Sequence, residues 1–330
     1  MLAAMRNPDL FHGWGRKRDY FEGWYFKLVN AAADYSVAFI PGILLGRGPA
    51  DSHSFVQIVD GVRASLSYVR FPTGAFRAER RSLAIAVQDS SFSLERLTLN
   101  IASQGAAVFG TVSFRNVKRW PDSAINPGSM GFYNYLPRMQ CYSQVCAMDM
   151  DLAGELEING LKVDFSGGRG YVEKNWGRAF PYGWIWIQSN SFGDRRASLS
   201  CSLGHIPLPW GSFRGHLVGL LVGDRFYSFT SMNKTAVRIV RSGSDVAIEL
   251  SNSRHSLRLD VATDPSKFVQ LEGPRDGRMV ALVQENLMGR VAVTLRATKG
   301  DELLFAGEGR CAGVEYGGDQ MLVLDQHEQQ

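Results

Sequence analysis

Short runs of β-branched and aromatic residues, separated by glycine, aspartate and serine, extend along nearly the whole sequence. Within these runs apolar and polar residues alternate, which is the pattern of a strand that buries one face. The sequence contains no long segment with the apolar spacing of an amphipathic helix. It therefore predicts an all-β chain, and 330 residues are enough for two domains.

Residues 154–165 contain the clearest single hairpin. Their sequence is GELEINGLKVDF, in which Leu156 and Ile158 alternate with polar residues on the first arm. Asn159 and Gly160 stand between the two arms, and this pair tolerates the positive φ angles of a type I′ turn. We expect two antiparallel strands that are joined by these two residues.

The two halves of the sequence resemble each other. The segment around Trp24 (GWYF) is similar to the segment around Trp184 (GWIW), an offset of 184 − 24 = 160 residues, and further strand-like segments follow both in the same order. This repeat predicts two domains, 1–178 with a bridging segment at its end, and 179–330. The Gly-x-aromatic start of each half resembles the opening strand of lipocalin-like barrels. We therefore expect two tandem lipocalin-like (calycin) β-barrels, a size that holds one small apolar ligand.

Composition and spacing exclude several classes of function. The net charge is +4 and the basic runs are short, which argues against a nucleic-acid groove. The six histidines lack metal-ligand spacing, and we expect no metal and no other cofactor. The first residues lack the apolar core of a signal peptide, and the sparse cysteines suit a reduced compartment, so we expect a cytoplasmic protein. No stretch has the length of a membrane span, although transient membrane contact for substrate uptake stays open.

The densest aromatic stretch of the sequence ends in a strand-like run. Alternate residues of a strand share a face, so Trp184, Trp186, Gln188 and Asn190 should lie together. A flat apolar wall with amide groups suits a pocket for a mostly apolar ligand that has one polar end. The alternative is a core position for both tryptophans.

The run before it carries the predicted acid. Glu173 and Asn175 should share one face, with Lys174 and Trp176 on the other. A glutamate that faces a water-poor aromatic cavity has a raised pKa and can donate a proton near neutral pH. We predict that Glu173 is the proton donor and that Lys174 and Asn175 orient it or the substrate. The alternative is an ion pair between Glu173 and a basic residue of a neighbouring strand.

Further candidates come from other aromatic segments. Glu22 and Glu285 are reserve acids. The remaining expected ligand contacts are Trp24, Tyr25, Tyr133, Tyr135, Gln140, Tyr142 and Trp176. For the candidates around Trp24 in the first half, the alternative is that the aromatic side chains form a core that closes the barrel.

Four motifs resemble those of the tocopherol cyclase family and its bacterial relatives. They are YFEGWYFK (20–27), GFYNYLPRMQCY (131–142), FSGGRGYVEKNWGRAFPYGWIWIQSNSF (165–192) and QENLMGRVAV (284–293). The resemblance implies a calycin-like fold of two lipocalin-type barrels with a ligand in or between them. Plant members of the family close the chromanol ring of vitamin E from a prenylated hydroquinone. The fold is also similar to that of carotenoid hydratases and of lipocalin-type Diels–Alderases.

One motif departs from the family pattern. Many bacterial members read Glu-Cys-Tyr-His where this sequence has Gln140, Cys141, Tyr142 and Ser143, and Arg138 stands at a usually apolar position. If a lost group carried the proton in relatives, a different substrate is expected here.

The resemblance and the residues together suggest an intramolecular cyclase. It would protonate an alkene of a prenylated phenol or related isoprenoid, and the phenol oxygen would capture the cation. The alternatives are a non-catalytic carrier of isoprenoid or quinone lipids, and a hydratase or pericyclase on the same fold. All of these bind a small hydrophobic ligand.

Overall fold

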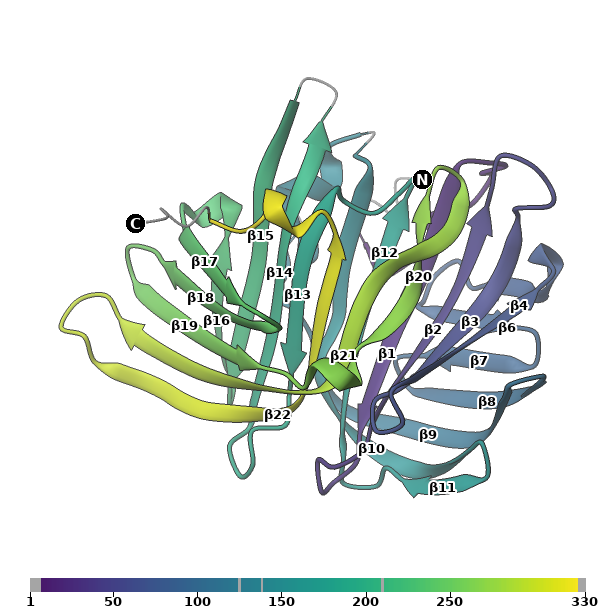
Figure 1. Cartoon of the computed structure of the whole chain (residues 1–330), viewed down its shortest axis with the longest axis horizontal. Helices are drawn as coiled ribbons and strands as arrows, with labels where there is room; N and C mark the ends of the chain where they lie inside the picture. The colour runs from purple at the N-terminus through teal and green to yellow at the C-terminus, as the bar shows by residue number, and fades with distance from the viewer. Residues whose placement is uncertain (1–6, 124–125, 138, 209–210, 326–330) are drawn as a thin grey trace. The chain divides into compact units, whose positions relative to one another are not determined.

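The computed structural model describes residues 7–123, 126–137, 139–208 and 211–325, so Arg138 lies outside the described residues (Figure 1). Within these ranges the regular structure consists of strands and short 3-10 turns. The strands form two antiparallel sheets. The predicted all-β class is confirmed.

The first sheet has the strand order β4-β3-β2-β1-β12-β10-β9-β8-β7-β6-β5, with β11 paired to β10. Its strands are β1 Tyr20–Val29, β2 Ser36–Leu45, β3 His53–Asp60, β4 Ser65–Phe71, β5 Phe76–Ala78, β6 Ala84–Val87, β7 Ser90–Ser93, β8 Arg96–Ser103, β9 Ala106–Lys118, β10 Cys141–Ile158, β11 Leu161–Asp164 and β12 Arg169–Gly177.

The second sheet has the order β16-β15-β14-β13-β22-β21-β19-β18-β17, with β20 paired to β21. Its strands are β13 Gly183–Ser189, β14 Ala197–Leu208, β15 Gly211–Val222, β16 Arg225–Thr230, β17 Ala236–Ser242, β18 Asp245–Ser251, β19 His255–Ala262, β20 Val269–Arg275, β21 Arg278–Ala297 and β22 Leu303–Gly318. The 3-10 turns are η1 Thr73–Ala75, η2 Gly131–Tyr135, η3 Ser231–Asn233, η4 Pro265–Lys267 and η5 Gln320–Leu322.

The two sheets repeat one topology. In each, the first strand pairs with the second and with the last, so that β2-β1-β12 corresponds to β14-β13-β22. Three hairpin-connected strands then follow the first strand to one edge of the sheet. The repeat predicted from the sequence is therefore present in the strand order.

The predicted hairpin is confirmed residue by residue. β10 ends at Ile158 and β11 begins at Leu161, and these two residues pair. Asn159 and Gly160 have φ angles of 50° and 79°, which are the positive values that a two-residue type I′ turn requires.

The aligned tryptophans of the two halves face opposite ways. Trp24 belongs to the core cluster of the first sheet, together with Phe26. In β13 the core residues are Ile185 and Ile187, so Trp184 points away from the core of the second sheet. A slip of one residue in a strand moves every side chain to the other face, so the sequence offset aligned the strands but not their faces.

The described chain forms two compact units. The first comprises Met1–Asp60, Ser65–Phe180 and Leu271–Ala281, and the second comprises Gly61–Ala64, Pro181–Gln270 and Leu282–Gln330. The main division, between Phe180 and Pro181, lies close to the expected boundary after Arg178. Each unit contains its own cluster of buried apolar side chains.

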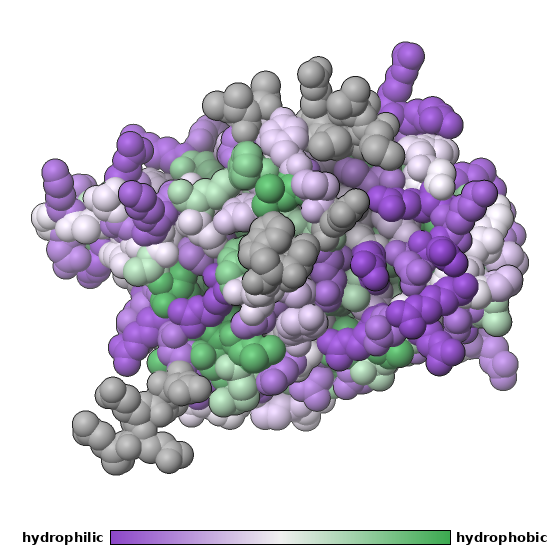
Figure 2. Space-filling model, turned by 90° about the horizontal axis from the view of Figure 1, so that it is seen from above, coloured by the Kyte–Doolittle hydropathy of each residue, from purple (hydrophilic) through white to green (hydrophobic). Residues whose placement is uncertain are grey.

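Polar side chains dominate the face that Figure 2 shows, and hydrophobic residues appear there in separate patches. Among the described residues, no helix has the length and apolar character to cross a membrane.

The pairing of β13 with β22 depends on a glycine beneath an indole ring. A Cβ atom at Gly317 would lie 2.0 Å from the Trp184 ring, far inside van der Waals contact. We predict that Gly317→Ala lowers the free energy of unfolding by about 1–3 kcal/mol through overpacking.

Urea denaturation at unchanged m value measures this effect. Gly48→Ala is the control, because a Cβ atom there meets nothing within 4 Å. Equal urea midpoints for the two variants would contradict the prediction.

Candidate active site

Two central strands of the first sheet bring together residues that are far apart in the sequence. β1 and β12 are antiparallel, and their register places Trp24 opposite Lys174 and Glu22 opposite Trp176. Alternate residues share a face, so all four side chains point to the side on which the two tryptophans join the core. The register therefore carries one carboxylate and one amino group into an apolar interior.

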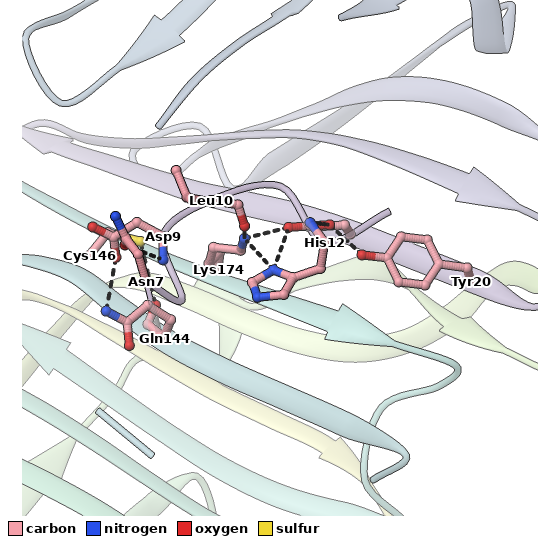
Figure 3. Close-up of polar contacts among 9 residues, drawn as sticks. Asn7, Asp9, Leu10, His12, Tyr20, Gln144, Cys146 and Lys174 are labelled. Carbon is pink, nitrogen blue, oxygen red and sulfur yellow. Dashed lines mark hydrogen bonds and ion pairs between the residues drawn. The ribbon is translucent and has the colours of Figure 1, made fainter. Parts of the chain in front are cut away.

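Glu22 and Lys174 form an ion pair in which both side chains are fully buried. The Lys174 Nζ also donates to the Leu10 carbonyl oxygen at 2.7 Å and lies 3.3 Å from His12 Nδ1 (Figure 3). The Glu22 Oε2 atom accepts hydrogen bonds from the Tyr20 hydroxyl and, at 2.9 Å, from the His12 backbone N–H. Both charges thus have additional hydrogen-bond partners, which a buried ion pair needs.

Aromatic rings enclose the Lys174 ammonium. Its Nζ lies 4.9 Å from the ring centroid of Trp24 and 4.8 Å from that of Trp176. Trp176 stacks with His12 at 4.1 Å and with Tyr142 at 5.3 Å between ring centroids. The electron-rich faces of two indoles stabilise a positive charge at this point.

The protonation states follow from burial and charge. Burial raises the pKa of Glu22, but the Lys174 ammonium and His12 outweigh this and hold the pKa below its usual 4.5. Burial lowers the pKa of Lys174 from 10.5, and Glu22 opposes the shift. Burial and the Glu22 carboxylate keep the pKa of Tyr20 well above 10.0. At neutral pH Glu22 is therefore a carboxylate, and Lys174 is a stronger acid than an exposed lysine.

The segment before β1 completes the cluster. Its Asp9 accepts a hydrogen bond from Gln144 Nε2 at 2.9 Å and pairs with Arg119, which fixes the segment against β10 (Figure 3). Leu10 and His12 follow in a stretch without strand periodicity. The sequence does not predict His12 as a site residue, because nothing in this irregular segment indicates that it folds back over β12.

Glu173 lies on the opposite face of β12 from Lys174 and Trp176, as the alternation predicts. Its buried carboxylate accepts a hydrogen bond from the Tyr171 hydroxyl at 2.6 Å. Asn175, half-buried, shares that face. The carboxylate that meets Lys174 between the tryptophans is therefore the reserve acid Glu22, and the role of Glu173 as proton donor stays a prediction.

Trp184, Trp186 and Gln188 share the face of β13 that points away from the core of the second unit. The Trp184 Nε1 donates to the Glu315 carboxylate, and Glu285 stands opposite Glu315 on the neighbouring strand. This is a second cluster of tryptophans and acids.

The three tryptophans of the 165–192 motif lie in different units, and their roles in ligand binding stay predictions. Trp176 faces the core of the first unit, whereas Trp184 and Trp186 belong to the second unit. The chain passes from one unit to the other between Phe180 and Pro181, so a contiguous sequence motif is divided between two sheets.

Of the predicted tyrosines, Tyr142 contacts a tryptophan beside the ion pair. It stacks on Trp176 and donates a hydrogen bond to the Leu136 carbonyl oxygen at 2.6 Å. Tyr133 and Tyr135 are half-buried in η2. Tyr142 thus extends the aromatic wall of Trp24 and Trp176.

The other predicted contacts lie elsewhere. Tyr25 stands opposite Glu173, on the face of β1 that points away from Trp24. Gln140 donates from Nε2 to the Phe180 carbonyl oxygen at 2.6 Å. Asn190 is buried directly after β13. Their roles in ligand binding stay predictions.

Comparison with known proteins identifies the family. The sequence pattern described as tocopherol cyclase-like matches residues 103–318, which is more than half of the chain. The chain belongs to the tocopherol cyclase-like family. The matched region includes Lys174 and Trp176, whereas His12, Glu22 and Trp24 precede it.

Two curated members of this family are similar in sequence. A probable chloroplastic tocopherol cyclase from Oryza sativa subsp. japonica is 21% identical over 215 residues, which is 62% of this chain and 46% of that protein. The chloroplastic tocopherol cyclase from Zea mays is 23% identical over 215 residues, 62% of this chain and 45% of that protein. The match thus spans about half the length of these curated relatives.

Solved structures show the same fold. CghA with Sch210972 superposes with a TM-score of 0.61 at 10% identity, covering 91% of this chain and 89% of CghA. Kievitone hydratase from Nectria haematococca superposes with a TM-score of 0.51 at 11% identity, covering 90% and 89%. At these identities the likeness is one of fold, and it agrees with tandem lipocalin-like domains in a tocopherol cyclase-like protein.

The ion pair makes stability depend on pH. Because the pKa of Glu22 is below 4.5 in the folded protein, the unfolded chain takes up this proton first as the pH falls. The contribution of the pair is present above the unfolded pKa and is lost as the pH falls through the folded pKa. We predict a decrease in urea midpoint between about pH 5 and pH 3 that is smaller in a Glu22→Gln/Lys174→Met double variant.

The double variant removes the titration of this pair and keeps every other carboxylate of the chain. Parallel midpoint-against-pH curves for the two proteins would show that the pair does not contribute.

Proposed function

We propose that this protein is an acid-catalysed intramolecular cyclase that closes a ring on a prenylated phenol or a related isoprenoid. The Lys174 ammonium is the proton donor, and Glu22 holds it in place. Trp24 and Trp176 stabilise the carbocation that forms on the substrate. Membership of a family named for a cyclase supports this class of reaction.

The observation that carries the proposal is a buried cation between two indole rings, balanced by one carboxylate. When Lys174 transfers its proton to an alkene carbon, the positive charge passes from nitrogen to the tertiary carbon. The site then has the same net charge as before, with Glu22 still opposite and the indole faces still beside it. Such preorganised surroundings need little rearrangement as the charge moves.

The phenol oxygen then captures the cation. A new C–O bond forms, and the hydroxyl proton returns to the neutral Lys174 amine, so the product is an isomer of the substrate. Cation–π stabilisation supplies about 2 kcal/mol at a desolvated site. Holding oxygen and alkene together supplies about 7–11 kcal/mol, so the shape of the interior contributes more than either ring.

Turnover and product mass test the proposal. The purified protein is incubated with a panel of prenylated hydroquinones, and the extracts are analysed by chiral chromatography with mass detection. We expect one product enantiomer of unchanged mass. A product heavier by one water would instead indicate a hydratase, and saturable binding without product would indicate a carrier.

Variants of the ion pair identify the acid. We expect Lys174→Met to lose turnover by about 100-fold or more, because the proton donor is gone. Since the single variant leaves Glu22 buried without its cation, the Glu22→Gln/Lys174→Met double variant serves as the folded test protein. The exposed Lys162→Met is the matched control and should retain turnover.

Glu173→Gln is the decisive comparison. If this variant loses turnover while the double variant remains active, Glu173 is the acid and the role of Lys174 is refuted.

A further inference from the structure

Beside the Glu22–Lys174 ion pair, the indole N–H of Trp24 has no acceptor among the residues that the structure describes. The Trp24 side chain is fully buried, and its Nε1 has no hydrogen-bond partner among the described residues. The neighbouring polar groups differ, because Lys174, Glu22 and Tyr20 are bonded to one another or to the backbone. A buried indole N–H normally finds an acceptor. A phenylalanine at this position would fill the core without leaving a donor unpaired. The presence of the Trp24 indole nitrogen therefore requires an explanation other than packing.

The surroundings define what could accept this hydrogen bond. The Trp24 ring stacks with Phe76 at 5.9 Å and contacts Phe11 at 6.2 Å, so a partner must be largely apolar. The Glu22 and Lys174 charges cancel, and an anion would therefore add an uncompensated charge in a buried place. The fitting ligand is an apolar molecule with a neutral acceptor oxygen.

We propose that the Trp24 indole N–H is the hydrogen-bond donor of a ligand site inside the first unit, which binds the neutral phenol, quinone or ether oxygen of an isoprenoid-type molecule. This inference rests on the proposed function for the class of ligand. The Lys174 ammonium lies 4.9 Å from the Trp24 ring centroid, so an oxygen bound at Nε1 is held in the same part of the interior as the proton donor. Trp24 thereby positions the oxygen, beyond its role as a wall for the cation.

The indole N–H is observed directly by NMR of protein labelled with ¹⁵N at the tryptophan side chains. The probes are geranyl-1,4-benzoquinone, which has neutral acceptor oxygens, and geranylbenzene, which has none. The Trp24 signal is assigned as the one that disappears in Trp24→Phe. We expect the quinone to move this proton signal downfield as a hydrogen bond forms, and geranylbenzene to leave it in place.

Affinities of the two probes give a second readout. We expect Trp24→Phe to weaken quinone binding about tenfold, the value of one neutral hydrogen bond, and to change geranylbenzene binding by less than about twofold. Trp14→Phe is the matched control, because Trp14 is 41% exposed and lies outside the core cluster. It should bind both probes as the wild type does.

Three results would overturn the inference: a Trp24 signal that stays fixed at saturating quinone, equal weakening of both probes in Trp24→Phe, or failure of the quinone to bind. The first is measured on the wild-type protein, so it stands even if Trp24→Phe does not fold. Because no turnover is measured, the two proposals can fail separately. A shifted signal without cyclisation refutes the cyclase, and cyclisation with a fixed signal refutes the Trp24 site.

Discussion

The fully buried ion pair of Glu22 and Lys174 is the interaction on which the first unit depends. Two opposite charges in an apolar interior are tolerable only when they meet and when their remaining hydrogen-bonding capacity is used. The register of β1 against β12 satisfies the first condition, and Tyr20, Leu10 and His12 satisfy the second. A slip of one residue between these strands would turn one of the two charges to the opposite face and leave the other buried without its partner.

The same arrangement links structure to chemistry. An ammonium between two indole faces and beside one carboxylate is a place where a positive charge is already compensated. Moving that charge by one proton transfer, from nitrogen to a substrate carbon, therefore changes little in the electrostatics of the interior. In our proposal, the Trp24 N–H, which has no partner among the described residues, supplies the second requirement of a ring closure, a fixed position for the oxygen.

Local patterns predict much of this fold. Alternation and turn residues identify the strands, the Asn159-Gly160 turn fixes one hairpin, and the offset of 160 residues between Trp24 and Trp184 reveals the repeated strand order. The face of the sheet to which a side chain points is harder to predict from the sequence. The aligned Trp24 and Trp184, for example, point to opposite sides of their sheets relative to the core. The direction depends on which residues the whole sheet buries, which a short motif does not contain.

The site is only partly visible in the sequence for the same reason. Glu22, Lys174, Trp24 and Trp176 are all identifiable as candidates, but their grouping depends on a strand pairing across about 150 residues. Local reasoning prefers Glu173, the neighbour of Lys174 in the chain, although neighbours in a strand face opposite ways. His12 lies in an irregular segment before β1, and the sequence of this segment has no periodic pattern that would predict its position beside Lys174.

The proposed chemistry requires that Lys174 is a buried ammonium that Glu22 keeps charged. Its most direct test is the ¹⁵Nζ chemical shift of labelled lysine at neutral pH, with the Lys174 signal assigned from Lys174→Met. We predict an ammonium shift in the wild-type protein and a neutral amine in Glu22→Gln, because removal of the carboxylate leaves the effect of burial on the Lys174 pKa largely unopposed. A neutral amine in the wild type, or an ammonium that Glu22→Gln leaves unchanged, would contradict it.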